Sequence, residues 1–143
     1  MAKFQMELPN DVMTDFMNII NNSDKIFGKM VEAGAEVVHL NILGSVPNGM
    51  RDSNIMKCLK VTKVYKTASD DGINCKVGFF GYFNNRYGVR TPAPLVINCF
   101  EYGRSDQDFP KQPFVRKAFK KSAIEKAMYE AQLSASGGIL KDE

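Results

Sequence analysis

The sequence has no tryptophan, one histidine and three cysteines in 143 residues. A single histidine excludes a metal site with several histidine ligands. Cys58, Cys75 and Cys99 lack the close spacing of a structural zinc site. Cysteines that are few, odd in number and far apart are typical of reduced thiols in an intracellular protein. We therefore expect no metal, no cofactor and no disulfide.

Long apolar runs, internal repeats and a strong net charge are also missing. No segment approaches the roughly 20 apolar residues that a membrane helix needs, and residues 1–7 lack the apolar core of a signal peptide. The net charge is +3, with 44% hydrophobic and 24% charged residues, which is ordinary for a globular domain. These features predict a single cytosolic domain over residues 1–133 and a flexible tail over residues 134–143.

Groups suited to catalysis are scarce. His39 lies in a segment with helical periodicity, where a packed or surface role is the ordinary one. No serine or cysteine is paired in the sequence with a plausible base. Glu101 with Asp106, or Asp70 with Asp71, fit a turn or the end of an element better than acid–base chemistry. We predict that the protein is not an enzyme.

Two helices are predicted near the N-terminus. Apolar residues recur with helical spacing from Asn10 or Asp11, either of which is a suitable N-cap, to Ile20. Residues 21–24 interrupt the pattern, which resumes over residues 25–40. The methionines of these helices fit a hydrophobic core, and an adaptable binding surface is the alternative.

A turn-rich connection follows. Val46-Pro47 is expected to be extended or turned, because proline disfavours the helical conformation in the residue before it. Asn48-Gly49 is a typical turn pair, and a short helix is expected after it. The simplest interpretation is a connection from helix to sheet. A phosphate-binding loop using Arg51 is the alternative, although the glycine spacing of such loops is missing.

Two strands come next in the prediction. Residues 59–66 alternate apolar side chains with threonine and lysine, and residues 73–80 return after a polar loop, 67–72, that ends in glycine. The lysines of the first strand are expected to face solvent and to protect a sheet edge, with polyanion binding as the alternative. They are Lys60, Lys63 and Lys66.

Residues 78–88 are rich in glycine and aromatic side chains, with arginines in and after them. Such a segment is typical of a strand edge or a loop that becomes ordered against a neighbouring subunit. The alternative is that its aromatic residues stack nucleic-acid bases. The candidate residues for either role are Phe79, Phe80, Tyr82, Phe83, Arg86, Tyr87 and Arg90.

The rest of the chain is organised around residues 95–119. Residues 95–102 suit a short helix or a strand, and Thr91-Pro92 before them favours the helix. Gly103 suits the left-handed conformation that ends such an element. Pro113 suits the first turn of a last helix that runs to about Leu133 with one basic face. Its apolar face would consist of Val115, Phe119, Ala123 and Ala127.

The predicted fold is therefore α+β, with long N-terminal helices and a C-terminal helix packed on a small antiparallel β-sheet. Residues 46–53 are similar to a Val-Pro-x-Asp-Thr-Gly-x-Leu-Arg turn, without its Asp-Thr pair. Residues 100–103 and 112–119 are similar to a motif of Glu-Tyr/Phe-Gly, a loop, and Gln/Lys-Pro-Phe-x-Arg-x-Ala-Phe. Together with the order of elements over about residues 10–131, these motifs resemble the small tail-component family of tailed bacteriophages, which includes neck and tail-completion proteins.

The resemblance implies a structural virion protein of the phage neck or tail end, acting in tail completion or head–tail joining, or a component of a phage-derived contractile bacteriocin. It implies a homo-oligomeric ring, with six copies as the expected number, assembled in the host bacterial cytoplasm. The implied partners are the tail tube, the sheath and neighbouring neck proteins, with a passing contact with DNA and none with a membrane. The motif residues expected to serve assembly are Glu101, Tyr102, Gly103, Pro113, Phe114 and Arg116.

Two other classes of function remain as alternatives. A small basic nucleic-acid-binding module would use the lysine-rich strand, the aromatic segment and the basic C-terminal helix. A regulatory enzyme subunit or small hydrolase would need Glu101, Arg116 and His39 to converge in one pocket.

Overall fold

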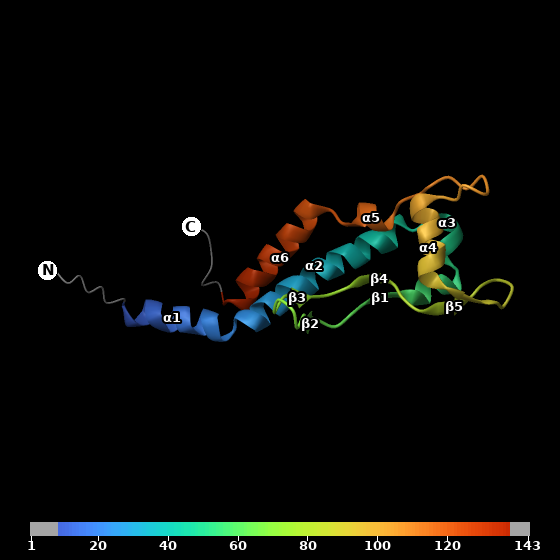
Figure 1. Ribbon diagram of the computed structural model, residues 1–143. Helices are drawn as coiled ribbons and strands as arrows, with labels where there is room; N and C mark the ends of the chain where they lie inside the picture. Colours follow the sequence, from blue (N-terminus) through green and yellow to red (C-terminus); the bar gives the residue numbers. More distant parts are fainter. Residues whose placement is uncertain (1–8, 138–143) are drawn as a thin grey trace.

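A computed structural model describes residues 9–137 and has an elongated shape, built around one long helix (Figure 1). This helix, α2 (Ser23–Ser45), has 23 residues. Helix α6 (Lys121–Ala135) packs along it, and strands β1, β3 and β4 contact it as well. The α+β class predicted from the sequence is confirmed.

Helix α1 (Asn10–Asn21) precedes α2, and Asn22 alone separates the two. Both N-terminal helices are confirmed. However, α2 continues to Ser45 instead of ending near Leu40. Val46 is extended, with a ψ of 131°, because Pro47 follows it.

The prediction of a turn at Asn48-Gly49 is wrong. Pro47, with a φ of −55°, leads directly into the short helix α3 (Asn48–Arg51). The fixed φ of proline is compatible with entry into a helix, so no turn is needed there. The short helix expected after it is present as the 3₁₀ helix η1 (Asn54–Cys58).

The single small sheet of the prediction is replaced by three two-stranded antiparallel sheets in the described part of the chain. The two long strands are interrupted because Thr62 hydrogen-bonds with both its backbone and its side chain. Its N–H donates to Lys76 O (2.9 Å), while its Oγ1 accepts the Lys76 N–H (2.8 Å). The pairs are β1 (Leu59–Val61) with β4 (Val77–Phe79), β2 (Tyr65–Lys66) with β3 (Ile73–Asn74), and β5 (Tyr82–Asn84) with β6 (Arg90–Pro92).

The lysines of the first predicted strand are exposed, as expected. Lys66 Nζ lies 2.8 Å from Asp24 Oδ2, in the first turn of α2. Because both side chains are largely exposed, this ion pair adds little to stability. The loop over residues 67–72 closes the β2–β3 hairpin as predicted, with the Thr67 N–H donating to Gly72 O at 2.9 Å.

Residues 93–102 form a helix, α4 (Ala93–Tyr102), so the helical alternative is confirmed.

The prediction of a single C-terminal helix is wrong. This segment is divided into α5 (Val115–Ala118) and α6, and Phe119 between them has a ψ of 71°. Phe119 is 54% exposed and does not belong to a buried apolar face. Pro113 lies before α5 instead of in its first turn. Helix α6 ends at Ala135, two residues past the predicted Leu133, and residues 138–143 lie outside the described part of the chain.

The hydrophobic core lies between the C-terminal half of α2, η1, β1, β4, α4 and α5. The rings of Phe79 and Phe114 meet edge to face in it, with centroids 6.1 Å apart. Helix α1 contributes nothing to this core, since none of its residues is buried. The expectation that the methionine-rich face of the first helix is core is therefore wrong. The core residues are Val38, Ile42, Val46, Met50, Ile55, Cys58, Leu59, Phe79, Ala93, Ile97, Phe114 and Ala118.

The close packing of α2 on α6 depends on Gly34. A Cβ atom at this position would lie 3.2 Å from Ile124 Cγ2 and 3.2 Å from Met128 Cγ. We expect Gly34→Val to lower the free energy of unfolding by about 1–3 kcal/mol, because a branched side chain would force α6 away from α2. Urea unfolding followed by circular dichroism would measure this.

Gly28→Ala is the control for this prediction. Gly28 is also inside α2, but a Cβ atom there would meet only Val64 Cγ1 at 3.8 Å, an ordinary contact. Alanine is favoured over glycine in a helix, so this variant should gain up to about 1 kcal/mol. Equal effects of the two substitutions would contradict the packing argument.

Candidate functional site

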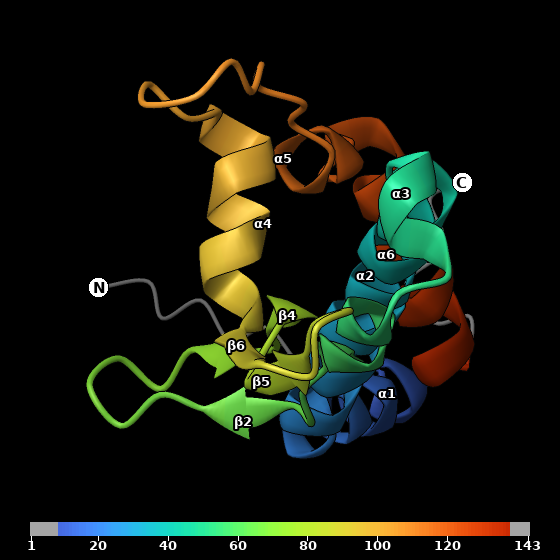
Figure 2. The same ribbon diagram turned by 90° about the vertical axis from the view of Figure 1, so that its right-hand side faces the viewer.

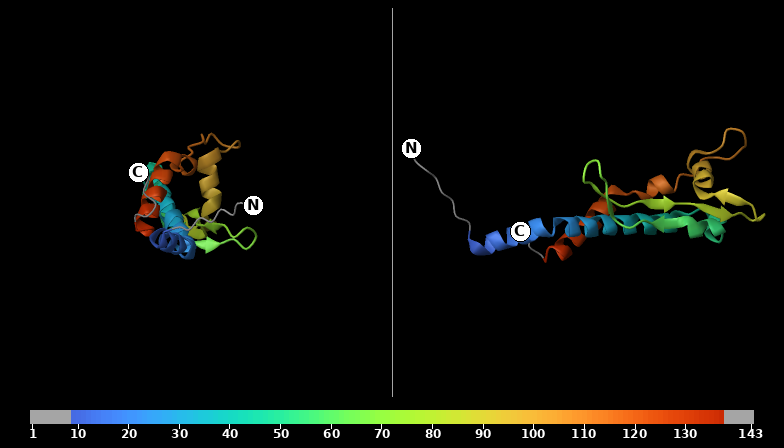
Figure 3. Two further views of the ribbon diagram at one scale, coloured as in Figure 1. Left: turned by 90° about the vertical axis from the view of Figure 1, so that its left-hand side faces the viewer. Right: turned by 60° about the horizontal axis from the view of Figure 1, so that its bottom comes forward.

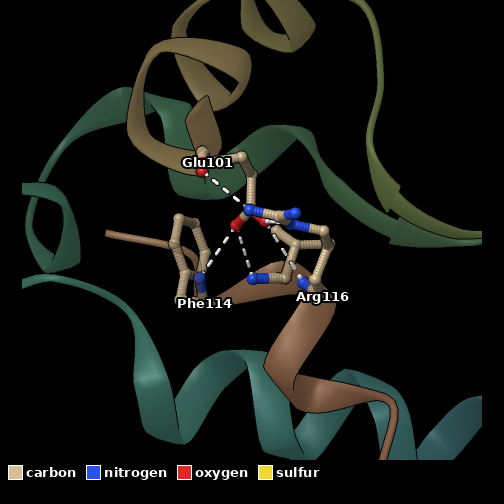
Figure 4. A network of polar contacts seen from close by, with 4 residues as sticks. Glu101, Phe114 and Arg116 are labelled. Atoms are coloured by element: carbon tan, nitrogen blue, oxygen red, sulfur yellow. Dashed lines mark hydrogen bonds and ion pairs between the residues drawn. The ribbon is translucent and has the colours of Figure 1, made fainter. Parts of the chain in front are cut away.

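The second motif of the sequence folds into one connected network around Glu101 (Figure 4). The Glu101 side chain is 5% exposed. Its Oε1 accepts the backbone N–H groups of Phe114 and Val115, each at 2.8 Å. Its Oε2 accepts Arg116 Nε at 3.0 Å and the Arg116 N–H at 3.4 Å. The carboxylate thereby satisfies the free N–H groups at the start of α5 and pairs with the arginine that follows them.

The chain reaches this arrangement by turning back at the end of α4. Gly103 has a φ of 73° and a ψ of −176°, a conformation that only glycine adopts readily. After it, the Arg104 N–H donates to Phe109 O at 3.1 Å, and the ring of Phe109 meets that of Phe100 with centroids 5.2 Å apart. The Gln112 N–H then donates to Phe100 O at 2.6 Å, which places the next residues beside Glu101. The positive φ expected of Gly103 is confirmed, but its ψ lies outside the left-handed helical region that the sequence predicted.

Two opposing effects act on the Glu101 carboxyl. Desolvation raises its pKa, while the hydrogen bonds from the N–H groups of Val115 and Phe114, and then from Arg116, lower it. The hydrogen bonds together outweigh the desolvation, so the pKa of Glu101 lies below its usual value. Glu101 is therefore charged in the folded protein at neutral pH, and both of its oxygens already have donors.

Arg116 connects this buried network to the surface. Its Nη2 donates to Glu101 O at 2.9 Å, and its guanidinium lies over the Tyr102 ring, 4.7 Å from the centroid. The Arg116 side chain is 53% exposed, and Tyr102 is 65% exposed. A guanidinium held by a carboxylate and stacked on an aromatic ring is restricted in its motion, so this pair forms an ordered part of the exposed surface.

A second set of exposed arginine–tyrosine pairs lies on the β5–β6 hairpin. The guanidinium of Arg90 lies over the Tyr82 ring at 4.3 Å, and that of Arg86 lies over the Tyr87 ring at 4.8 Å. Asn85 Oδ1 accepts the N–H groups of Tyr87 (2.9 Å) and Val89 (3.0 Å), which closes the tip of the hairpin. Tyr82 and Tyr87 are 59% and 74% exposed. We refer to Tyr82, Arg86, Tyr87 and Arg90 as the arginine–tyrosine surface.

The arginine–tyrosine surface and the Glu101 network lie at the same end of the molecule. Figure 2 shows α4 standing between them, with the β5–β6 hairpin at its start and the loop over residues 103–112 at its end. Helix α1 projects from the opposite end (Figures 1 and 3).

The candidate residues from the sequence thus fall into two groups. Some belong to the interior and support the fold: Phe79, Phe83, Glu101, Gly103, Pro113 and Phe114 are buried or half-buried. The others have exposed side chains available to a partner: Phe80, Tyr82, Arg86, Tyr87, Arg90, Tyr102 and Arg116. For the apolar face of α1, the sequence offered a binding surface only as the alternative to a core, because helical spacing alone does not show whether such a face is covered.

The structure gives little support to the two other sites considered from the sequence, a phosphate-binding loop with Arg51 and a pocket that includes His39. Arg51 Nε donates to Val46 O at 3.3 Å, so its guanidinium lies at the end of α2 instead of facing an open loop. His39 lies on α2 and is not part of the Glu101 network as described above. Within residues 9–137, no cluster of three or more metal-ligating side chains occurs, and no helix is long and apolar enough to cross a membrane.

Comparison of the chain with protein-family models, with curated proteins and with solved structures finds no match.

Proposed function

We propose that this protein is a structural component of the neck or tail end of a tailed phage, or of a phage-derived contractile bacteriocin. It would assemble in the host bacterial cytoplasm as a homo-oligomeric ring that caps or connects the tail tube. Six copies remain the expected number. The tail tube, the sheath and adjoining neck proteins would be its partners in the particle.

The observation that supports this proposal most strongly is the distribution of uncovered apolar and aromatic surface. Helix α1 exposes five large apolar side chains at one end of the molecule, and the arginine–tyrosine surface lies at the other. Extensive exposed apolar surface is typical of proteins that function in an assembly. Two different surfaces at two ends allow each copy to contact other copies and other proteins of the particle at the same time, and a heterologous contact between copies forms a ring when the rotation closes. The α1 side chains are Val12, Met13, Phe16, Met17 and Ile20, and we call them the α1 stripe.

The Glu101 network supports the proposal in a second way. The residues that resemble the family motif are not scattered in the fold but form one unit, with distances of 2.8–3.4 Å from the carboxylate to its donors. A motif of this kind would preserve the position of Tyr102 and Arg116 on an assembled surface.

Electron microscopy of particles purified from the producing cell, with the chain tagged at its C-terminus, tests the proposal. We expect the tag to label a discrete ring at one end of a tail. A head beside the ring would indicate a phage, and a headless tail would indicate a bacteriocin. A tag found only on free protein or on nucleic acid would contradict the structural role.

A small nucleic-acid-binding module is the second candidate, and the arginine–tyrosine surface is the observation that favours it. Exposed aromatic rings beside guanidinium groups can stack bases and contact phosphates. Binding of a fluorescent 20-nucleotide single strand, measured by anisotropy at several salt concentrations, tests this function. Submicromolar affinity that falls steeply with salt and is lost in Tyr82→Ala would favour the module. The ring proposal predicts weak binding that the substitution does not change.

A further inference from the structure

Helix α1 lacks the packing that a short helix needs. It has 12 residues, and none of them is buried. Isolated helices shorter than about 12–15 residues are only marginally stable in water, and most helices in proteins are stabilised by packing of their apolar face. The α1 stripe is about half exposed at every position, from 49% at Val12 to 59% at Phe16. A partner that covers this stripe is therefore expected.

The same molecule has an apolar groove that nothing fills. Helix α2 forms its floor, the β3–β4 segment one wall and α6 the other, and its volume is about 500 Å³. This volume holds several large side chains, as in ordinary binding pockets. Phe27, which is 50% exposed, lies one helical turn before Val31 and extends the apolar floor toward the start of α2. The lining residues that are partly or largely exposed are Val31, Val77, Phe80, Phe119, Ile124 and Met128, and we call this feature the α2–α6 groove.

The charges of the helix and of the groove are complementary. Helix α1 carries two aspartates, Asp11 and Asp15, and no basic residue. Among the described residues, the one charged side chain that lines the groove is that of Lys76. An acidic amphipathic helix suits a site of this kind. It does not suit an anionic membrane surface, which attracts helices with lysine or arginine on their polar face.

Helix α1 contributes no residue to the lining of the α2–α6 groove of its own subunit. Asn22 joins α1 to α2 almost without a break, since the Asn22 N–H donates to Asn18 O (3.1 Å) and the Ile26 N–H donates to Asn22 O (2.9 Å). Helix α1 therefore leads away from the body of its own subunit, as Figures 1 and 3 show. The groove begins near Val31, in the part of α2 that lies beyond this junction.

We propose that the α1 stripe of one copy binds in the α2–α6 groove of the next copy, and that this exchange of helices joins the subunits of the ring. The inference rests on the proposed ring, and it specifies how neighbouring copies contact each other. Each subunit donates one helix and accepts another, so the contact is heterologous. The arginine–tyrosine surface at the other end then remains free for the tail tube or adjoining proteins.

Disulfide cross-linking tests the contact, because Cys75 is part of the groove lining. The background is the full chain with Cys99→Ser. Met13→Cys places a thiol on the α1 stripe, and Asn18→Cys is the matched control on the opposite side of the same helix. After mild oxidation with copper–phenanthroline, we expect Met13→Cys to yield a reducible ladder of dimers, trimers and larger species. Asn18→Cys should yield at least about fivefold less, and adding Cys75→Ser to Met13→Cys should abolish the ladder.

Each other outcome contradicts the inference in a defined way. A disulfide within the monomer would mean that α1 folds back onto its own groove. A product that stops at the dimer would mean a reciprocal exchange between two copies, which cannot build a ring. Equal cross-linking of the two cysteines would mean that the stripe has no specific partner.

A substitution in the stripe gives an independent measurement. Phe16→Ser should weaken self-association, measured by mass photometry over a dilution series, at least about tenfold, as expected for loss of a central aromatic contact. Its thermal unfolding as a monomer should not change, because Phe16 packs in no core. Unchanged association would contradict the inference.

The two experiments distinguish failure of the helix exchange from failure of the proposed tail function. A ring on tails without the Met13–Cys75 ladder would leave the structural role standing and disprove the helix exchange. A ladder together with a tag that is absent from tails would confirm the exchange and disprove the tail role.

Discussion

Replacing Glu101 with glutamine is expected to lower the free energy of unfolding by about 2–3 kcal/mol, because hydrogen bonds to charged groups contribute more than neutral ones. Glutamine keeps the shape of the side chain but loses the charge that Arg116 and the α5 N–H groups face at 2.8–3.4 Å. The loss is smaller than for a fully buried ion pair, because the Arg116 side chain is 53% exposed. Thermal and urea unfolding would measure it.

Asp106→Asn is the matched control for this substitution. Asp106 also pairs with an arginine, Arg104, but its side chain is 60% exposed. Exposed ion pairs contribute little, so the unfolding midpoint of this variant should stay within experimental error of the parent chain. If Glu101→Gln and Asp106→Asn behave alike, the Glu101 network does not hold the motif together.

The pH dependence of stability gives Glu101 a second signature. Its pKa is lower in the folded protein than its usual value, so the stability it contributes is present above the usual carboxyl pKa and is lost as the pH falls through the lower, folded pKa. The difference in unfolding free energy between the parent chain and Glu101→Gln should therefore shrink on going from about pH 7 to about pH 3. A difference that does not depend on pH would assign the effect to packing.

Local patterns in the sequence account for the helices and for Gly103. The spacing of apolar residues predicts α1 and α2, because a helical period of 3.6 is visible in a short window, whereas for residues 95–102 it is Thr91-Pro92 that favours a helix over a strand. Gly103 is predicted from its place after an apolar segment. These features depend on residues a few positions apart, so no tertiary information is required.

The features that the sequence does not reveal depend on contacts between distant residues. The break between α5 and α6 contains neither proline nor glycine. There the Ala118 carbonyl accepts Asn41 Nδ2 from α2 at 3.0 Å, a contact 77 residues away in the chain. Glu101 looks like the end of an element in the sequence, and its role appears only when α5 lies beside it. The exposure of Phe16 on α1 likewise depends on which other elements reach that helix.

Gly103→Ala is expected to lower the free energy of unfolding by about 3–4 kcal/mol. Two costs add up at this position. The backbone conformation, with a φ of 73° and a ψ of −176°, is strained for any residue with a Cβ atom. The added Cβ would also lie 2.9 Å from Phe109 O and 3.1 Å from Lys111 N, both of which belong to the backbone and cannot rotate away.

Gly88→Ala separates these two costs. Gly88 has a φ of 77°, but a Cβ atom there would have no neighbour within 4 Å. This variant should lose only about 1–2 kcal/mol, the cost of the backbone conformation. The excess loss in Gly103→Ala then measures how tightly the loop over residues 103–112 closes on the end of α4. This closure positions Phe114 and Arg116 against Glu101. Equal losses of stability in both variants would show that the closure of this loop does not depend on the absence of a side chain at Gly103.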